Sequence, residues 1–197
     1  LRAALKEWVA SRRQGDPASL RLPLVIVAAE GGASRAAAWM LASLRMLDHQ
    51  TGGETSRHIF AISGVSGGSL GAASYLRMVA AKGDADGRLN WENPEIRHAL
   101  KAISTSDLLS ATISTYFLSD MFGSLIGPAW TLGGVPDRNA ALELAFQLLW
   151  KRSSGFQLPE GVDSKFLGLR TSIANSSAVR ASLPHLMLNG TDVTTGK

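Results

Sequence analysis

The chain has 197 residues and no cysteine, which excludes disulfide bonds, a thiol nucleophile and thiolate ligands for a metal ion. It also has no H-x-x-x-H pattern and no cluster of carboxylates, so the sequence indicates neither a metal ion nor a cofactor. The lack of cysteine fits a reducing compartment, and no signal peptide is visible. A cytoplasmic or membrane-associated location is therefore favoured.

Long apolar runs are missing as well. The charge-free run 59–76 contains four glycines and four serines, and the run 121–136 is short and is interrupted by glycine and proline. A transmembrane helix needs about 20 predominantly apolar residues, so none is expected. The segment Leu108–Leu132 is unusually apolar for a region with few strand signals. A buried helical pair is the favoured interpretation of this segment, and an exposed lid that faces lipid is the alternative.

Clusters of basic residues are sparse, although the formal net charge is +4 and the sequence pI is about 9.8. Arg12-Arg13 and Lys151-Arg152 are the only adjacent pairs, and no stripe of aromatic residues is interleaved with them. Nucleic acid is therefore not an expected partner. An ordinary solvated surface is favoured over a face that attracts anionic lipid headgroups.

The chain 1–197 is interpreted as one α/β domain that begins with a helix over residues 1–14. Four apolar residues share one face of that helix: Leu1, Leu5, Trp8 and Val9. We expect this face to dock on the core of the domain rather than on a membrane surface. Between residues 84 and 161 we expect a mostly helical insertion.

The segment Gly64-Val65-Ser66-Gly67-Gly68-Ser69 carries the strongest functional signal. It follows the apolar run Ile59–Ile62 and leads into a helix-compatible stretch, Leu70–Ala81. A G-x-S-x-G pattern at a strand-to-helix turn is typical of a nucleophile elbow, in which Gly64 and Gly68 lack bulk and the hydroxyl of Ser66 projects. A glycine-rich turn with an inert serine is the alternative, and the catalytic interpretation is favoured.

A second glycine-rich corner precedes the first one in the chain. The apolar run Leu24–Ala29 predicts a buried strand, residues 30–35 a turn, and residues 36–49 a helix with Met40, Leu41, Leu44 and Leu47 on one face. Together with the next strand this is a β-α-β unit, whose strands are parallel. Because ligands bind at the carboxyl edge of such sheets, we expect both corners to face one crevice. One corner would supply a hydroxyl and the other backbone N–H donors, as acyl transfer requires.

Three segments resemble motifs of the patatin-like phospholipases. Residues 30–36 resemble the oxyanion motif D-G-G-G-x-R-G, residues 64–68 resemble the nucleophile elbow, and residues 188–196 are similar to an N-x-T-D-x-x-T-G stretch. Asp137-Arg138 followed by Leu142-Glu143 is a softer match to the bacterial branch. The resemblance covers residues 23–196, which is nearly the whole chain.

The resemblance implies a three-layer α/β fold, with a parallel-rich central sheet and helices on both faces. It implies a serine–aspartate dyad without a catalytic histidine, and Ser66 as the nucleophile. The expected substrate is a phospholipid or another fatty-acyl ester, with peripheral contact to a membrane. The residues that would form the oxyanion hole are Gly31, Gly32, Ala33, Ser34 and Arg35.

The first corner departs from the family pattern. Glu30 replaces the usual aspartate, Ala33 the third glycine and Ala36 the last glycine. Alanine still offers an N–H group, so the donor function survives where φ is negative. If φ must be positive at Ala33, that residue is strained.

The catalytic aspartate of the family, in an Asp-Gly-Gly or Asp-Gly-Ala turn, has no counterpart in this sequence. Asp86-Gly87 follows the elbow helix, so we expect it at the opposite edge of the sheet, and we interpret Asp86 as a turn former. Asp192 is not at the family's catalytic position. We therefore expect the aspartate beyond residue 197, a domain that is incomplete at its C-terminus, and little or no activity in this fragment alone.

Other interpretations of single residues remain open. His185 could belong to a Ser-His-Asp triad, but it lies at the start of a predicted strand, far from the active edge, and is interpreted as structural. A nucleotide site at Gly31-Gly32 is disfavoured, because the glycine spacing is wrong and Glu30 would repel a phosphate. Arg35 opposes the dipole of its helix, so it could brace the loop, meet a phosphate headgroup or be an ordinary surface residue.

Two further functions are kept as alternatives. The missing aspartate and the substituted glycine loop favour a non-catalytic module on a patatin-like fold, which would bind lipid or protein. Acyl transfer to an acceptor other than water is the third hypothesis, since it would use the same serine.

Overall fold

The computed structural model describes residues 2–13, 21–107, 109–121, 138–152 and 183–190. The chain begins with helix α1 (Arg2–Arg13), strand β1 (Val25–Ala29) and helix α2 (Ala33–Thr51). Next come helix α3 (Glu54–His58), strand β2 (Ile59–Val65) and helix α4 (Gly67–Lys82). They are followed by α5 (Pro94–Thr105), α6 (Leu109–Thr115), the π-helical turn η1 (Tyr116–Met121), α8 (Arg138–Arg152) and β3 (His185–Asn189).

The three strands form a parallel sheet in the order β1-β2-β3. Ala29 of β1 lies opposite Gly64 of β2, and Val65 of β2 lies opposite Asn189 of β3. The carboxyl ends of all three strands therefore meet at one edge. This arrangement confirms the predicted parallel β-α-β unit, whose β2 extends three residues beyond the apolar run used to predict it.

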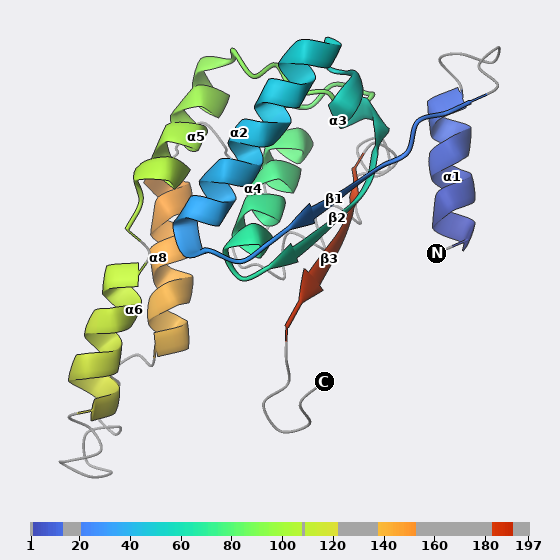
Figure 1. Cartoon of the computed structure of the whole chain (residues 1–197). Coiled ribbons are helices and arrows are strands. Elements are labelled where there is room, and N and C mark those ends of the chain that lie inside the picture. The colour runs from blue at the N-terminus through green and yellow to red at the C-terminus, as the bar shows by residue number, and fades with distance from the viewer. Residues whose placement is uncertain (1, 14–20, 108, 122–137, 153–182, 191–197) are drawn as a thin grey trace.

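Helices α2 and α4 pack against each other and against the sheet, and they enclose the main apolar core (Figure 1). Small residues on α4 allow the close approach: a Cβ atom at Gly71 would lie 3.0 Å from the Cα of Ala37. Met40, Leu41 and Leu44 are buried as their spacing predicts. Leu47, however, is 41% exposed, and the next residue, Asp48, is buried in its place.

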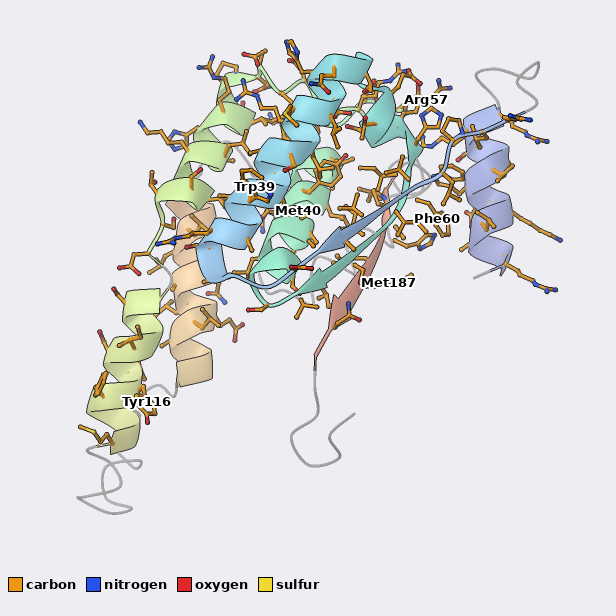
Figure 2. The ribbon with its side chains drawn as sticks, in the orientation of Figure 1. Trp39, Met40, Arg57, Phe60, Tyr116 and Met187 are labelled. Atoms are coloured by element: carbon orange, nitrogen blue, oxygen red, sulfur yellow. The ribbon has the colours of Figure 1, made fainter. Side chains whose placement is uncertain are left out.

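The N-terminal helix α1 packs on β2 through its predicted apolar face. The ring of Trp8 meets that of Phe60 edge-on, with centroids 5.7 Å apart, and Leu5 and Val9 pack around this pair. In Figures 1 and 2, Phe60 lies on the side of the sheet toward α1, whereas α2 and α4 lie on the other side. The apolar face of α1 is thus used inside the domain.

The described residues between 84 and 161 are helical apart from the loops that join the helices. Helix α5 begins at an Asn93 cap, whose Oδ1 accepts the N–H of Glu95 at 2.9 Å. Helix α6 runs beside α8 (Figure 1). The prediction of a buried helical pair over 108–132 is wrong for four apolar side chains that are between 43% and 51% exposed: Ile113, Tyr116, Phe117 and Met121. These side chains lie on α6 and η1, which are seven and six residues long. Residues 108 and 122–132 of that segment lie outside the described residues.

The chain is therefore an α/β fold with a three-stranded parallel sheet and helices packed against it. Within the residues that the structure describes, no helix is both long and apolar enough to cross a membrane. The division into a single domain with a helical insertion stays a prediction.

Candidate functional site

The two glycine-rich corners lie against each other at the carboxyl edge of the sheet. One corner joins β1 to α2 and the other joins β2 to α4 (Figure 1). A Cβ atom at Gly67 would overlap the carbonyl oxygen of Ala33 and lie 2.6 Å from its carbon. A Cβ atom at Gly68 would lie 2.6 Å from the carbonyl oxygen of Glu30. The two backbones are thus in direct contact, and only glycine fits at positions 67 and 68.

Ser66 is the single residue between β2 and α4, and its backbone conformation is unusual, with φ 50° and ψ −120°. A positive φ is uncommon for any residue other than glycine, and a conformation outside the favoured regions costs about 1–3 kcal/mol. The Ser66 carbonyl accepts the N–H of Ser69 at 3.0 Å and that of Leu70 at 3.4 Å, which starts α4. Ser66 itself is exposed. Its backbone is therefore held by the helix, and its side chain is left accessible.

The glycines that flank Ser66 are required by close backbone contacts. A Cβ atom at Gly64 would lie 2.7 Å from both the N and the Cα of Ser69. Together with the contact of Gly68, this is the steric reason for small residues two positions on either side of the serine.

Gly31 brings the first corner directly to the serine. A Cβ atom at Gly31 would lie 3.3 Å from the Cβ of Ser66 and 3.9 Å from its Oγ. The absence of a side chain at Gly31 therefore keeps space free beside the hydroxyl. The two predicted corners are brought together as the β-α-β unit predicts.

Helix α2 begins immediately after Gly31-Gly32, and its first turn points toward the same edge. Gly32 has φ 151°, and the Ala36 N–H donates to the Gly32 carbonyl at 3.3 Å. The N–H groups of Ala33, Ser34 and Arg35 have no acceptor within the helix, because the first turn of any α-helix leaves its N–H groups unpaired. These N–H groups carry the positive end of the helix dipole. Ser34 is half-buried, and the Arg35 side chain is exposed.

Ala33 occupies the place where the family pattern has glycine, and its φ is 52°. The sequence predicts strain at Ala33 if its φ is positive, and this condition is met. A left-handed conformation costs a residue with a Cβ atom about 1–2 kcal/mol. Among the described residues, Ala33 and Ser66 are the two non-glycine residues with positive φ, and they lie on the two facing corners.

Asn189 is a polar residue of this edge to which the sequence assigned no role beyond its motif. It ends β3, and its Nδ2 donates to Ser63 Oγ at 2.7 Å and to the Gly64 carbonyl at 3.4 Å. Its position in the N-x-T-D stretch directly after a predicted strand was the available signal.

Asp86 and His185 lie away from this edge. Asp86 faces Arg57 and Arg88, at 3.9 Å and 3.7 Å, near the amino end of β2, as expected. Asp86 lies within a turn, as predicted, and the Oδ1 of Asp84 supports that turn by accepting the backbone N–H groups of Asp86 and Arg88. His185 starts β3, with its ring 5.0 Å from that of Phe60. Asp192 lies outside the described residues.

A network of ion pairs occupies the amino edge of the sheet. Glu54 pairs with Arg88 and with Arg57, and the His58 ring nitrogen Nδ1 lies 2.7 Å from the carbonyl oxygen of Glu54. Partial burial raises the pKa of the Glu54 carboxyl, but the hydrogen bond from Arg88 and the charges of Arg88 and Arg57 outweigh it. The pKa of Glu54 is therefore held below its ordinary value of 4.5.

Asp48 forms a second, buried polar cluster at the amino edge. The residue is 2% exposed, and its carboxylate accepts the backbone N–H of Ser56 at 2.7 Å, the Ser56 hydroxyl, and the Trp91 Nε1–H at 2.7 Å. All three partners are donors, so an ionised carboxylate satisfies them together. This cluster joins the end of α2 to α3 and to the loop after α4.

No group of three or more histidine, aspartate or glutamate side chains within the described ranges is arranged to hold a metal ion. Comparison of the chain with protein-family models, with curated proteins and with solved structures finds no match in any of the three. The features that bear on function are therefore the geometry of the two corners and the motifs that they contain.

Proposed function

We propose that this chain is part of a serine hydrolase of the patatin-like type, which cleaves fatty-acyl esters such as phospholipids with Ser66 as nucleophile. The observation that carries the proposal is the backbone of Ser66, with φ 50° and ψ −120°, directly opposite Gly31. Glycine would occupy this conformation more easily, so a serine there requires a reason other than folding. Presentation of a nucleophilic hydroxyl is that reason in a strand-to-helix elbow.

In the proposed reaction, Ser66 Oγ attacks the carbonyl carbon of the ester, and its proton passes to an aspartate carboxylate. The tetrahedral intermediate collapses with cleavage of the ester C–O bond, and the leaving alcohol takes up the proton. Water then attacks the acyl-serine and releases the fatty acid. We expect the aspartate beyond residue 197, as the resemblance implies.

The oxyanion of the intermediate is assigned to the N–H groups at the start of α2, from Gly31 to Arg35. Gly31 leaves room beside Ser66 Oγ for a substrate oxygen to approach these donors. Removal of one donor of this kind typically costs about 3–4 kcal/mol of transition-state stabilisation. Helices α2 and α4 both begin at this edge, so both dipoles favour negative charge there.

The three-layer arrangement of the whole domain, with helices on both faces of a larger sheet, belongs to the same proposal, as does peripheral contact with a membrane. Exposed apolar side chains on α6 and η1 are compatible with a lipid substrate.

The direct test is hydrolysis of a chromogenic fatty-acyl ester by the full-length protein. We expect Ser66→Ala to reduce turnover to background, and Ser104→Ala, on the exposed surface of α5, to leave it unchanged. Unaffected turnover in Ser66→Ala would refute the proposal. Complete inactivity of the unmodified protein toward esters would favour a non-catalytic binding module, and an acylated alcohol or amine in place of free fatty acid would favour acyl transfer.

A further inference from the structure

Asn189 connects the end of β3 to the strand that leads into the Ser66 corner. In the sheet Asn189 lies opposite Val65, and its side chain reaches back to Ser63 and Gly64, with Nδ2 at 2.7 Å from the hydroxyl of Ser63 and 3.4 Å from the carbonyl of Gly64. Both acceptors precede Ser66 by no more than three residues. One side-chain amide thus contacts the backbone of the elbow from the neighbouring strand.

The elbow needs such support on the side of β2. A strained backbone conformation persists only where its surroundings fix it from several directions. On the side of α4, Ser66 is fixed by the first turn of the helix and by the close contact of Gly67 with Ala33. On the side of β2, Val65 comes directly before Ser66, and the residue before Val65 is Gly64, which has no side chain and has room for none.

Gly64 is therefore held by its close contact with the backbone of Ser69, by the ladders to β1 and β3, and by the amide of Asn189. The Asn189 Nδ2 group has two N–H donors, and its two acceptors lie on adjacent residues of β2. An aspartate of the same shape has no donor for the Gly64 carbonyl, and a leucine has none for either acceptor. The identity of the residue, and not only its size, matters for these contacts.

We propose that Asn189 is a positioning residue that holds the Ser66 hydroxyl in its reactive place by fixing Ser63 and Gly64. This inference rests on the proposed function of Ser66. Asn189 acts through β2 and does not touch the ester. Its loss should therefore slow the chemical step and leave the binding of substrate unchanged.

The test uses the full-length protein and two readouts, ester hydrolysis and the rate of covalent labelling by a fluorophosphonate. We expect kcat and the labelling rate to fall at least tenfold in Asn189→Asp and in Asn189→Leu with KM unchanged, since misplacement of a reacting group by about 1 Å costs about a hundredfold. Ser63→Ala removes one of the two contacts and should give a smaller loss. In the Ser63→Ala background, Asn189→Leu should cost less than it does alone.

Asn90→Leu is the matched control, because Asn90 also makes a single side-chain contact to backbone, with the N–H of Glu92 at 3.1 Å, but at the amino edge. It should leave kcat and labelling unchanged. If the unmodified protein is labelled at Ser66 and the Asn189 variants react equally fast, the positioning role is wrong. A rise in KM at constant kcat would overturn it as well, because that pattern indicates contact with substrate. If the unmodified protein neither reacts nor turns over ester, the proposed function itself fails. If Asn189→Leu does not fold, the kcat values and labelling rates of Asn189→Asp and Ser63→Ala test the positioning role in its place.

Discussion

At the carboxyl edge of the sheet the backbone carries strain and the polar side chain of Ser66 is exposed, whereas at the amino edge charged side chains pair with one another. At the first edge, the non-glycine residues Ala33 and Ser66 have positive φ angles, and glycines without side chains bring the two corners into contact. The second has ion pairs around Glu54 and a buried carboxylate, Asp48, with three donors. The same β-α-β unit contributes to both edges.

This difference indicates a division of roles within the molecule. Strain at one edge lowers the free energy of unfolding, so it must be offset elsewhere in the fold. The buried contacts of Asp48 contribute to that offset more than exposed ion pairs do, because surface pairs are typically worth about 0–1 kcal/mol. Substitutions at the amino edge should therefore change stability alone, and those at the carboxyl edge should change reactivity.

The largest expected effect is that of Gly67→Ala. The new methyl group would overlap the Ala33 carbonyl, so the corners must separate, at a cost of about 3 kcal/mol in the free energy of unfolding. Chemical denaturation of the variant and of Gly190→Ala, whose new Cβ would meet none of the described atoms within 4 Å, measures this cost. Equal stability of the two variants would show that the corners are not in contact.

Asp48→Asn should lower the stability by about 2 kcal/mol. The asparagine amide cannot accept from all three donors, and a buried donor without a partner costs about 1–3 kcal/mol. The same unfolding measurement reports the loss, while the rate of fluorophosphonate labelling at Ser66 should stay unchanged in the protein that remains folded. A large fall in labelling at full stability would remove the distinction between the edges.

Ser66→Gly should stabilise the protein by about 1 kcal/mol, because glycine adopts a positive φ without the strain of a Cβ atom. Ser66→Ala keeps the Cβ atom, so it serves as the matched variant and should have the stability of the unmodified chain. Both variants should be inactive. A destabilised Ser66→Gly would mean that the conformation of Ser66 is not strained.

The smallest effect concerns the pH dependence that Glu54 contributes. Its pKa is lowered in the folded protein, so its contribution to stability is fully present above the ordinary value of 4.5 and is lost as the pH falls through the lower, folded value. The difference in thermal midpoint between the unmodified protein and Glu54→Gln should therefore shrink below pH 4.5. A difference that is independent of pH would exclude an electrostatic origin.

The parts of the fold that could be predicted are those where one residue type alone satisfies a steric need. Gly64, Gly67 and Gly68 mark the elbow because no Cβ atom fits there. The apolar run Leu24–Ala29 marks the position of β1, but the predicted burial of this strand is wrong, because Ile26 is 62% exposed. The parallel pairing then brings the corners together without further information.

Other features carry little or no signal in the sequence. The short helix α3 has no apolar periodicity that would predict it. The positive φ of Ala33 could not be predicted either, because alanine does not favour that conformation. Burial of Asp48 was missed because the helical pattern favoured Leu47, although an acidic residue in the last turn of a helix opposes the dipole and could have indicated a buried partner.

The central claim, that both corners act on one carbonyl group, is tested most directly by a crystal structure of the full-length protein after reaction with an alkyl fluorophosphonate. The account predicts phosphorus bonded to Ser66 Oγ, with the phosphoryl oxygen within hydrogen-bond distance of N–H groups between Gly31 and Arg35. An unmodified Ser66, or a phosphoryl oxygen that points away from the start of α2, would contradict it.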